Sequence, residues 1–120
     1  MISRADIFGS EADDDGISSP AAAMLMVRSG PQAGDRFVLS ATSTRLGRHP
    51  ESDVSLDDIS VSRRHAEIER TSSEYVLRDV GSLNGTYVNQ RRVDSVVLQQ
   101  GDEILIGRFR LLFLAPTEVA

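Results

Sequence analysis

The sequence predicts a single all-β domain, a β-sandwich, and three observations favour it. Short apolar runs recur from Met24 onward, and turn-forming residues such as Gly, Pro, Asn and Asp separate them. The runs return at intervals of roughly 8–12 residues, a spacing typical of sandwiches. No window of eleven or more residues carries the 3.6-residue apolar stripe of a helix. The 120 residues suffice for one hydrophobic core.

The apolar runs define ten expected strands. In chain order they cover residues 24–28, 36–39, 44–48, 54–56, 64–69, 75–80, 86–88, 96–98, 103–106 and 109–114. In the fifth run Ala66 and Ile68 alternate with acidic residues, which predicts a half-buried antiparallel strand. The last two runs are almost continuously apolar, so we expect both of their faces to be covered.

Composition divides the chain into a folded body and two tails. Residues 1–22 are acidic and then rich in Gly, Ser, Pro and Ala, which predicts a disordered tail. Residues 23–116 form the expected domain, and residues 117–120 form a short C-terminal tail. Residues 1–20 carry five acidic side chains against one arginine, so most of the net charge of −5 lies in this tail.

Charge and residue usage exclude several classes of function. The body is nearly neutral, and counterion release on nucleic acid needs a basic surface, so we expect no nucleic-acid partner. The chain has no cysteine and therefore no cysteine-ligated zinc or thiolate chemistry. No apolar run reaches the roughly 20 residues of a membrane helix, and no signal-peptide core follows Met1. We expect a cytoplasmic protein without a membrane partner, metal or cofactor.

Four motifs follow one another at strand ends: Gly47-Arg48, Ser62-Arg63-Arg64-His65, the segment 81–86, and Gly101-Asp102. Two guanidinium groups and a hydroxyl on neighbouring loops match the geometry of a phosphate dianion. The amide of Asn84 can donate to a carbonyl and accept from an N–H, which suits an extended peptide backbone. The motifs therefore predict a phosphopeptide site.

Other roles of these residues are less favoured. Ser62 lacks the Gly-x-Ser-x-Gly elbow of a nucleophile, and His65 reads as a structural histidine, so we expect no catalytic residue. Asp57-Asp58 is expected to be a solvated acidic turn rather than a metal pair. Asn84-Gly85 predicts a hairpin turn in addition to its binding role. Arg91-Arg92 is expected at an exposed hairpin tip.

The series GR…SRRH…GSLNGTYVN over residues 47–89 resembles the core signature of the forkhead-associated (FHA) domain. The stretches GRHPESD, VSRRHAE and DVGSLNGTYVN are most similar to the small actinobacterial FHA regulators of 2-oxoglutarate metabolism. These are of the glycogen accumulation regulator and oxoglutarate dehydrogenase inhibitor type. The resemblance implies an FHA-type β-sandwich of about eleven strands whose loops at one end bind a phosphopeptide.

The resemblance also implies roles for single residues. Arg48 and Ser62 match the positions that bind the phosphate, and Arg63 matches a neighbouring contact. Asn84 matches the residue that holds the peptide backbone, and Leu83 lies beside it. Four further positions match the structural support of the site: Gly47, His65, Gly85 and Thr86.

Three classes of function stay open on this basis. The first is an adaptor for phosphothreonine-containing proteins in Ser/Thr-kinase signalling, with a kinase as a further partner. The second is an inhibitor that docks on 2-oxoglutarate-metabolising enzymes without phosphorylation. The third is a structural β-module with an inactive site. The resembling regulators carry a threonine pair in the tail that folds back when phosphorylated, but residues 1–22 contain no threonine, so we do not expect that switch here.

Overall fold

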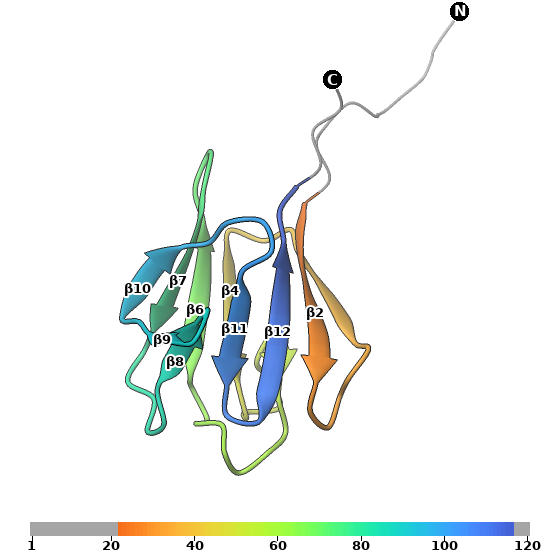
Figure 1. The fold of residues 1–120 in the computed structure, drawn as a ribbon, viewed down its shortest axis with the longest axis vertical. Coiled ribbons are helices and arrows are strands. Elements are labelled where there is room, and N and C mark those ends of the chain that lie inside the picture. Colours follow the sequence, from red (N-terminus) through yellow and green to blue (C-terminus); the bar gives the residue numbers. More distant parts are fainter. Residues whose placement is uncertain (1–21, 117–120) are drawn as a thin grey trace, which may run out of the picture.

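A computed structural model describes residues 22–116 and shows a sandwich of two β-sheets (Figure 1). Within these residues there are eleven strands and no helix, which confirms the predicted all-β class. The strands are β2 (Ala23–Ser29), β3 (Arg36–Leu39), β4 (Ser43–Gly47), β5 (Val54–Ser55), β6 (Ala66–Arg70), β7 (Tyr75–Asp79), β8 (Thr86–Val88), β9 (Arg91–Arg92), β10 (Ser95–Val97), β11 (Glu103–Ile106) and β12 (Phe109–Leu114). The expected tails, Ala22 apart, lie outside the described residues.

The first sheet has five strands in the order β10-β7-β6-β4-β5, and the second has six in the order β3-β2-β12-β11-β8-β9. All neighbours are antiparallel except β4 and β5, which form a short parallel pair. The chain crosses between the sheets after β3, β7, β9 and β10. The loop after β4, the loop before β6 and the crossing from β7 to β8 lie at one end of the sandwich, at the bottom of Figure 1.

The core lies between the sheets and is mainly aliphatic, with Phe109 and Phe113 as its largest members. Tyr75 packs edge-on against Phe113 with ring centroids 5.6 Å apart. The Tyr75 hydroxyl accepts a hydrogen bond from the Ala23 backbone N–H at 3.2 Å. This contact ties the first strand of one sheet to the other sheet.

Two strand predictions are wrong in detail. Arg91 and Arg92 are exposed, as expected, but they form β9 and pair with β8, and the tip of this hairpin is Asn89-Gln90. Both tip residues have positive φ, 50° and 72°, which a tight turn of this hand requires. In β11 and β12 the buried residues alternate with partly or fully exposed ones. Only the inward face of these strands is covered, because no second layer packs outside the six-stranded sheet within the described chain (Figure 1).

Candidate functional site

Three loops lie at the end of the sandwich that is at the bottom of Figure 1, and we call them the site loops. They are residues 48–53 after β4, residues 56–65 before β6, and residues 80–85 between β7 and β8. Backbone hydrogen bonds join the first two loops, from Arg48 N to Ser62 O at 3.0 Å and from His49 N to Arg63 O at 3.2 Å. The predicted residues Arg48, Ser62 and Asn84 therefore come from three different loops that lie side by side.

A backbone carbonyl of the neighbouring loop holds the Arg48 side chain. Its Nε donates to the carbonyl of Val61 at 3.0 Å, and the residue is partly buried. This bond uses one of the five N–H donors of the guanidinium. Within residues 22–116 no ion pair involves Arg48, Arg63 or Arg64. The loops thus present positive charge that no described carboxylate neutralises.

Gly47 allows the first two loops to approach each other. A Cβ at this position would lie 2.1 Å from the carbonyl oxygen of Arg63 and 2.9 Å from its carbonyl carbon. Both are backbone atoms and cannot rotate away. The missing side chain is therefore a condition for the contact between the two loops.

The hydroxyl of Ser62 is oriented by the third loop. Its Oγ accepts a hydrogen bond from the backbone N–H of Leu83 at 2.9 Å. Because that donor occupies a lone pair, the hydroxyl hydrogen stays free to donate to an anion. Leu83 itself is 86% exposed, so its side chain projects into solvent beside Ser62.

His65 is completely buried beneath the loops. Its Nδ1 accepts from the backbone N–H of Ser62 at 3.1 Å, and its Nε2 lies 2.8 Å from the carbonyl oxygen of Gly85. Nδ1 is thus the acceptor and Nε2–H the donor, the tautomer of a neutral ring. Burial lowers the pKa of His65 and outweighs the Gly85 bond and the charge of Asp79, which act to raise it. His65 links two site loops and stays uncharged.

Asn84 lies at the rim of the site. Its amide nitrogen donates to the carbonyl of Ser60 at 2.9 Å. Among the described residues no donor bonds its carbonyl oxygen, which leaves that atom able to accept from a peptide N–H. The predicted hairpin at Asn84-Gly85 is wrong, because β7 and β8 belong to different sheets and the segment is a crossover between them. Gly85 has a φ of +89° and packs against the Arg92 guanidinium.

Asp79 supports the crossover and was missed by the sequence analysis. Its carboxylate accepts from the backbone N–H groups of Gly81 and Ser82, and from the hydroxyls of Ser82 and the buried Thr86, at 2.6–2.9 Å. Burial alone raises the pKa of Asp79, but the bonds from Ser82, Thr86 and Gly81 outweigh it and lower the pKa to about 2. A carboxylate two residues before a glycine is a recognisable turn signal.

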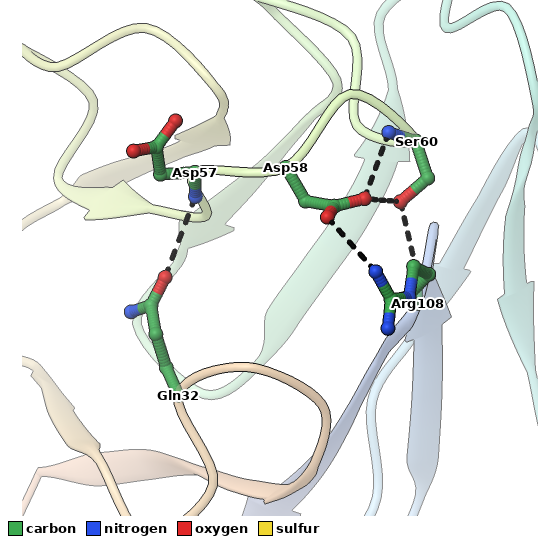
Figure 2. A network of polar contacts seen from close by, with 5 residues as sticks. All are labelled: Gln32, Asp57, Asp58, Ser60 and Arg108. Atoms are coloured by element: carbon green, nitrogen blue, oxygen red, sulfur yellow. Dashed lines mark hydrogen bonds and ion pairs between the residues drawn. The ribbon is translucent and has the colours of Figure 1, made fainter.

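The loop before β6 is held by a second carboxylate, and here the predicted solvated turn is wrong for Asp58 (Figure 2). The Asp58 carboxylate accepts from the backbone N–H and hydroxyl of Ser60 and from Arg108 at 3.3 Å. The Ser60 hydroxyl in turn accepts from the Arg108 backbone N–H at 3.0 Å. The hydrogen bonds from Ser60 and the charge of Arg108 lower the pKa of Asp58. In residues 22–116 no three potential metal ligands gather at one point.

Between these anchored residues, Ile59 is 91% exposed. A bound partner that covers this side chain would remove apolar surface from water, which is favourable. Ile59 and Leu83 flank the pair Ser60 and Asn84, which are joined by a hydrogen bond. The sequence analysis missed Ile59 because a single apolar residue in a polar loop carries no periodic signal.

A cavity of about 260 Å³ opens beside the loop after β4. It is lined by Arg45, Leu46, His49, Glu51, Ser52, Arg64, Ala66, Glu67 and Val80. Two arginines and two glutamates balance one another there, so this cavity lacks the positive character of the neighbouring loops. Within residues 22–116 we find no helix of the length and apolar character that crossing a bilayer requires.

Comparisons with known proteins agree with this geometry. A sequence profile of the FHA domain matches residues 44–107. The glycogen accumulation regulator GarA of Mycobacterium tuberculosis (strain ATCC 25618 / H37Rv) is 54% identical over 108 residues, 88% of this chain and 67% of GarA. The oxoglutarate dehydrogenase inhibitor of Corynebacterium efficiens is 60% identical over 93 residues, 78% of this chain and 66% of the inhibitor.

Solved structures show the same fold. Mycobacterium tuberculosis EmbR in complex with a low-affinity phosphopeptide superposes with a TM-score of 0.75 and 35% identity, over 83% of this chain and 26% of EmbR. A structure described for phosphothreonine-dependent FHA domain interactions has a TM-score of 0.72 and 31% identity, over 78% of this chain and 95% of that one. The profile match and the identities of 54–60% show the family. This chain belongs to the FHA domain family.

Proposed function

We propose that the chain binds phosphothreonine segments of partner proteins through Arg48, Ser62, Arg63 and Asn84, and acts as a regulator without catalysis. The observation that carries the proposal is the meeting of the three site loops. They present guanidinium groups that form no ion pair within residues 22–116, and an oriented hydroxyl, at one end of the sandwich. The likeness to structures solved with a phosphopeptide and for phosphothreonine-dependent interactions supports it.

Each residue has a defined task in this proposal. The terminal amino groups of Arg48 and the hydroxyl of Ser62 donate to the phosphate oxygens, with charge-assisted bonds worth about 1.5–3 kcal/mol each. The exposed Arg63 adds a second positive charge. Asn84 accepts from the peptide backbone through its free carbonyl oxygen. Leu83 and Ile59 cover apolar side chains of the same peptide.

The test is a binding titration with a phosphothreonine peptide, its unphosphorylated copy and its phosphoserine copy. Removing Arg48 leaves the dianion poorly matched, so Arg48→Ala should cost about 2–4 kcal/mol of binding. The matched control is Arg78→Ala, because Arg78 is an exposed arginine on the outward face of the five-stranded sheet. A loss of less than threefold in Arg48→Ala contradicts the assignment of Arg48 as a principal phosphate ligand.

A second partner class rests on a separate observation, the 60% identity to an oxoglutarate dehydrogenase inhibitor. In this candidate function the folded body docks on a 2-oxoglutarate-metabolising enzyme that is not phosphorylated. The test is inhibition of such an enzyme by this chain before and after phosphatase treatment of both proteins. Inhibition that survives the treatment supports this class, and inhibition lost with it assigns the effect to phosphothreonine binding.

The cellular setting follows from the same proposal. A partner phosphorylated on threonine requires a Ser/Thr protein kinase, which we propose as the source of the signal and as a further partner. We place the protein in the cytoplasm, where such kinases act on metabolic enzymes. A pull-down from the lysate of its own cells, with and without phosphatase and compared with Arg48→Ala, identifies the partners.

A further inference from the structure

The outward faces of the two sheets differ in chemistry at β4 and β6 of one sheet and β2 and β12 of the other. Outward residues of β4 and β6 in the five-stranded sheet are Ser43, Arg45, Glu67 and Glu69, all polar. In the six-stranded sheet, β2 and β12 instead turn Met24, Met26, Leu112 and Leu114 outward. No described element covers this second face (Figure 1).

The register makes the apolar face continuous. Met24 pairs with Val38 on one side and with Leu114 on the other. Met26 pairs with Leu112 in the adjacent outward row. Four of these residues, Met24, Met26, Leu112 and Leu114, are partly exposed, and Val38 is more exposed, at 60%. We call them the apolar face; single exposed apolar residues are common, but a contiguous group of this kind marks an interaction surface.

Arginines border the apolar face at the ends of its strands. Arg36 pairs with Met26 on the side away from Leu112, and Arg28 follows Met26 two residues along β2. Both are exposed, and no ion pair within residues 22–116 engages either of them. Arg110, near the start of β12 and opposite Ser29, is paired with Glu103 at 3.2 Å. A segment that binds here should combine apolar side chains with negative charge.

Residues 1–21 have this combination. They contain Asp6, Glu11 and Asp13-Asp14-Asp15 around the adjacent apolar pair Ile7-Phe8. They join the domain at Ala22, two residues before Met24. We propose that this N-terminal segment docks on the apolar face, with Ile7 and Phe8 over Met24, Met26 and Leu112 and its carboxylates beside Arg28 and Arg36.

Chain length allows this placement. The 13 residues between Phe8 and Ala22 allow a span of up to about 45 Å when extended, whereas seven-residue β2 is only about 23 Å long. A segment tethered so close to its binding surface has an effective concentration on the order of millimolar. A second copy of the chain lacks this advantage and brings the same arginines, which repel one another.

The three methionines of the chain make a direct test possible. Two of them, Met24 and Met26, belong to the apolar face and the third is Met1, so methyl-labelled methionine gives three NMR signals from the full chain. The chain has no cysteine, so Ser10→Cys carries a single nitroxide label. We expect this label to broaden the Met24 and Met26 methyl signals in the otherwise unchanged protein.

A tethered chain that does not dock also gives some broadening, so the result is read against matched variants. In Ile7→Ser/Phe8→Ser the broadening should fall by about threefold, because the apolar contact is removed. Arg36→Glu should lower it as well, whereas Arg78→Glu on the opposite sheet should leave it unchanged. The thermal midpoint of each variant shows that the domain itself stays folded.

Three results overturn the proposal. The first is equal broadening in Ile7→Ser/Phe8→Ser and in the parent chain. The second is broadening in a mixture where label and methyl groups are on different molecules, which assigns the face to a second copy. The third is a tail-dependent shift of the Arg48 and Ser62 amides without one at the Met24 and Met26 methyls, which places the tail at the phosphopeptide loops.

Discussion

Asp79 illustrates how a single side chain prepares a binding loop. Its carboxylate collects four donors from the turn that follows β7 and so fixes the path of the chain to Leu83 and Asn84. A partly buried carboxylate with charge-assisted bonds holds a loop more firmly than neutral contacts do. In the same turn the backbone N–H of Leu83 donates a hydrogen bond to the Ser62 hydroxyl, so Asp79 positions Ser62 through the backbone.

Replacing the Asp79 carboxylate should change how the unfolding free energy depends on pH. The pKa of Asp79 is about 2 in the folded protein against an ordinary value of 3.8. A lowered pKa stabilises the fold above the ordinary value and the benefit is lost as pH falls toward 2. Asp79→Asn should therefore lose about 2 kcal/mol of unfolding free energy at pH 7.

The difference between Asp79→Asn and the parent protein should shrink between pH 4 and pH 2. Urea unfolding at pH 7, 4, 3 and 2 measures it. A difference that stays constant over this range shows that the hydrogen-bond geometry, and not the ionised carboxylate, provides the stability.

Ile59 is a second single residue with a defined role in peptide binding. Its exposed side chain should contribute to peptide affinity and little to the fold. Ile59→Ser should weaken binding of a phosphopeptide with apolar residues after the phosphothreonine by about tenfold, or about 1.4 kcal/mol. The same variant should bind a glycine-substituted peptide as the parent does. Equal losses for both peptides contradict a side-chain contact with Ile59.

At the scale of elements, the site depends on loops that touch rather than on strands. Strand β4 ends at Gly47, and the loop before β6 passes directly over this position. The Asp58, Ser60 and Arg108 network fastens the same loop to the turn between β11 and β12, so a loop of one sheet is anchored on the other (Figure 2). Both contacts are local packing conditions that strand pairing alone does not impose.

Gly47→Ala tests this contact. The added methyl group meets backbone atoms of Arg63, so the loops must separate, at a cost of about 1–3 kcal/mol in unfolding free energy. Phosphopeptide affinity should fall too, because Arg48 and Ser62 move apart. The control is Gly101→Ala. Gly101 lies in the turn before β11, at the end of β11 opposite to the Arg108 turn, and has a φ of +87°. A Cβ added there would meet no atom within 4 Å.

Gly101→Ala should lower the melting temperature through backbone strain and leave peptide affinity unchanged. Differential scanning fluorimetry and the peptide titration separate the two effects. An equal loss of affinity in both variants attributes the effect of Gly47→Ala to general destabilisation.

At the scale of the whole molecule, His65 sits where the two sheets join. Its backbone N–H bonds Leu46 O in the five-stranded sheet at 3.0 Å, and its ring reaches Gly85, which leads into the six-stranded sheet. A neutral ring satisfies both polar partners at once. A protonated ring has two donors and faces the Ser62 N–H with the wrong polarity.

The stability of the sandwich should therefore depend on pH through His65. Its pKa is lowered by burial from 6.5, so its stabilising effect is complete above pH 6.5 and is lost as pH falls through the folded-state value. The unfolding free energy should fall from pH 7 to pH 5, and this fall should be smaller in His65→Gln. Guanidinium unfolding at the two pH values measures it, and identical falls in both proteins contradict the prediction.

The sequence was sufficient for the parts of this protein that depend on short-range pattern. Alternating apolar residues and turn-forming glycines predicted ten of the strands and the all-β class, and the ordered motifs around Arg48, Ser62 and Asn84 predicted the family. One boundary shifted: the fifth expected strand began at residue 64, but regular pairing begins at Ala66. Strand β9 escaped prediction because two arginines carry no apolar signal.

The tertiary structure alone decided which residues hold the loops and which face stays open. Asp58 and Arg108 are joined across 50 residues of chain, and no local pattern records such a contact. The apolar runs of β11 and β12 predicted burial on both sides, yet only one side is covered, because a sandwich of two layers gives each sheet a single neighbour. Sequence pattern determines which side chains are apolar; the number of layers determines which of them find a partner.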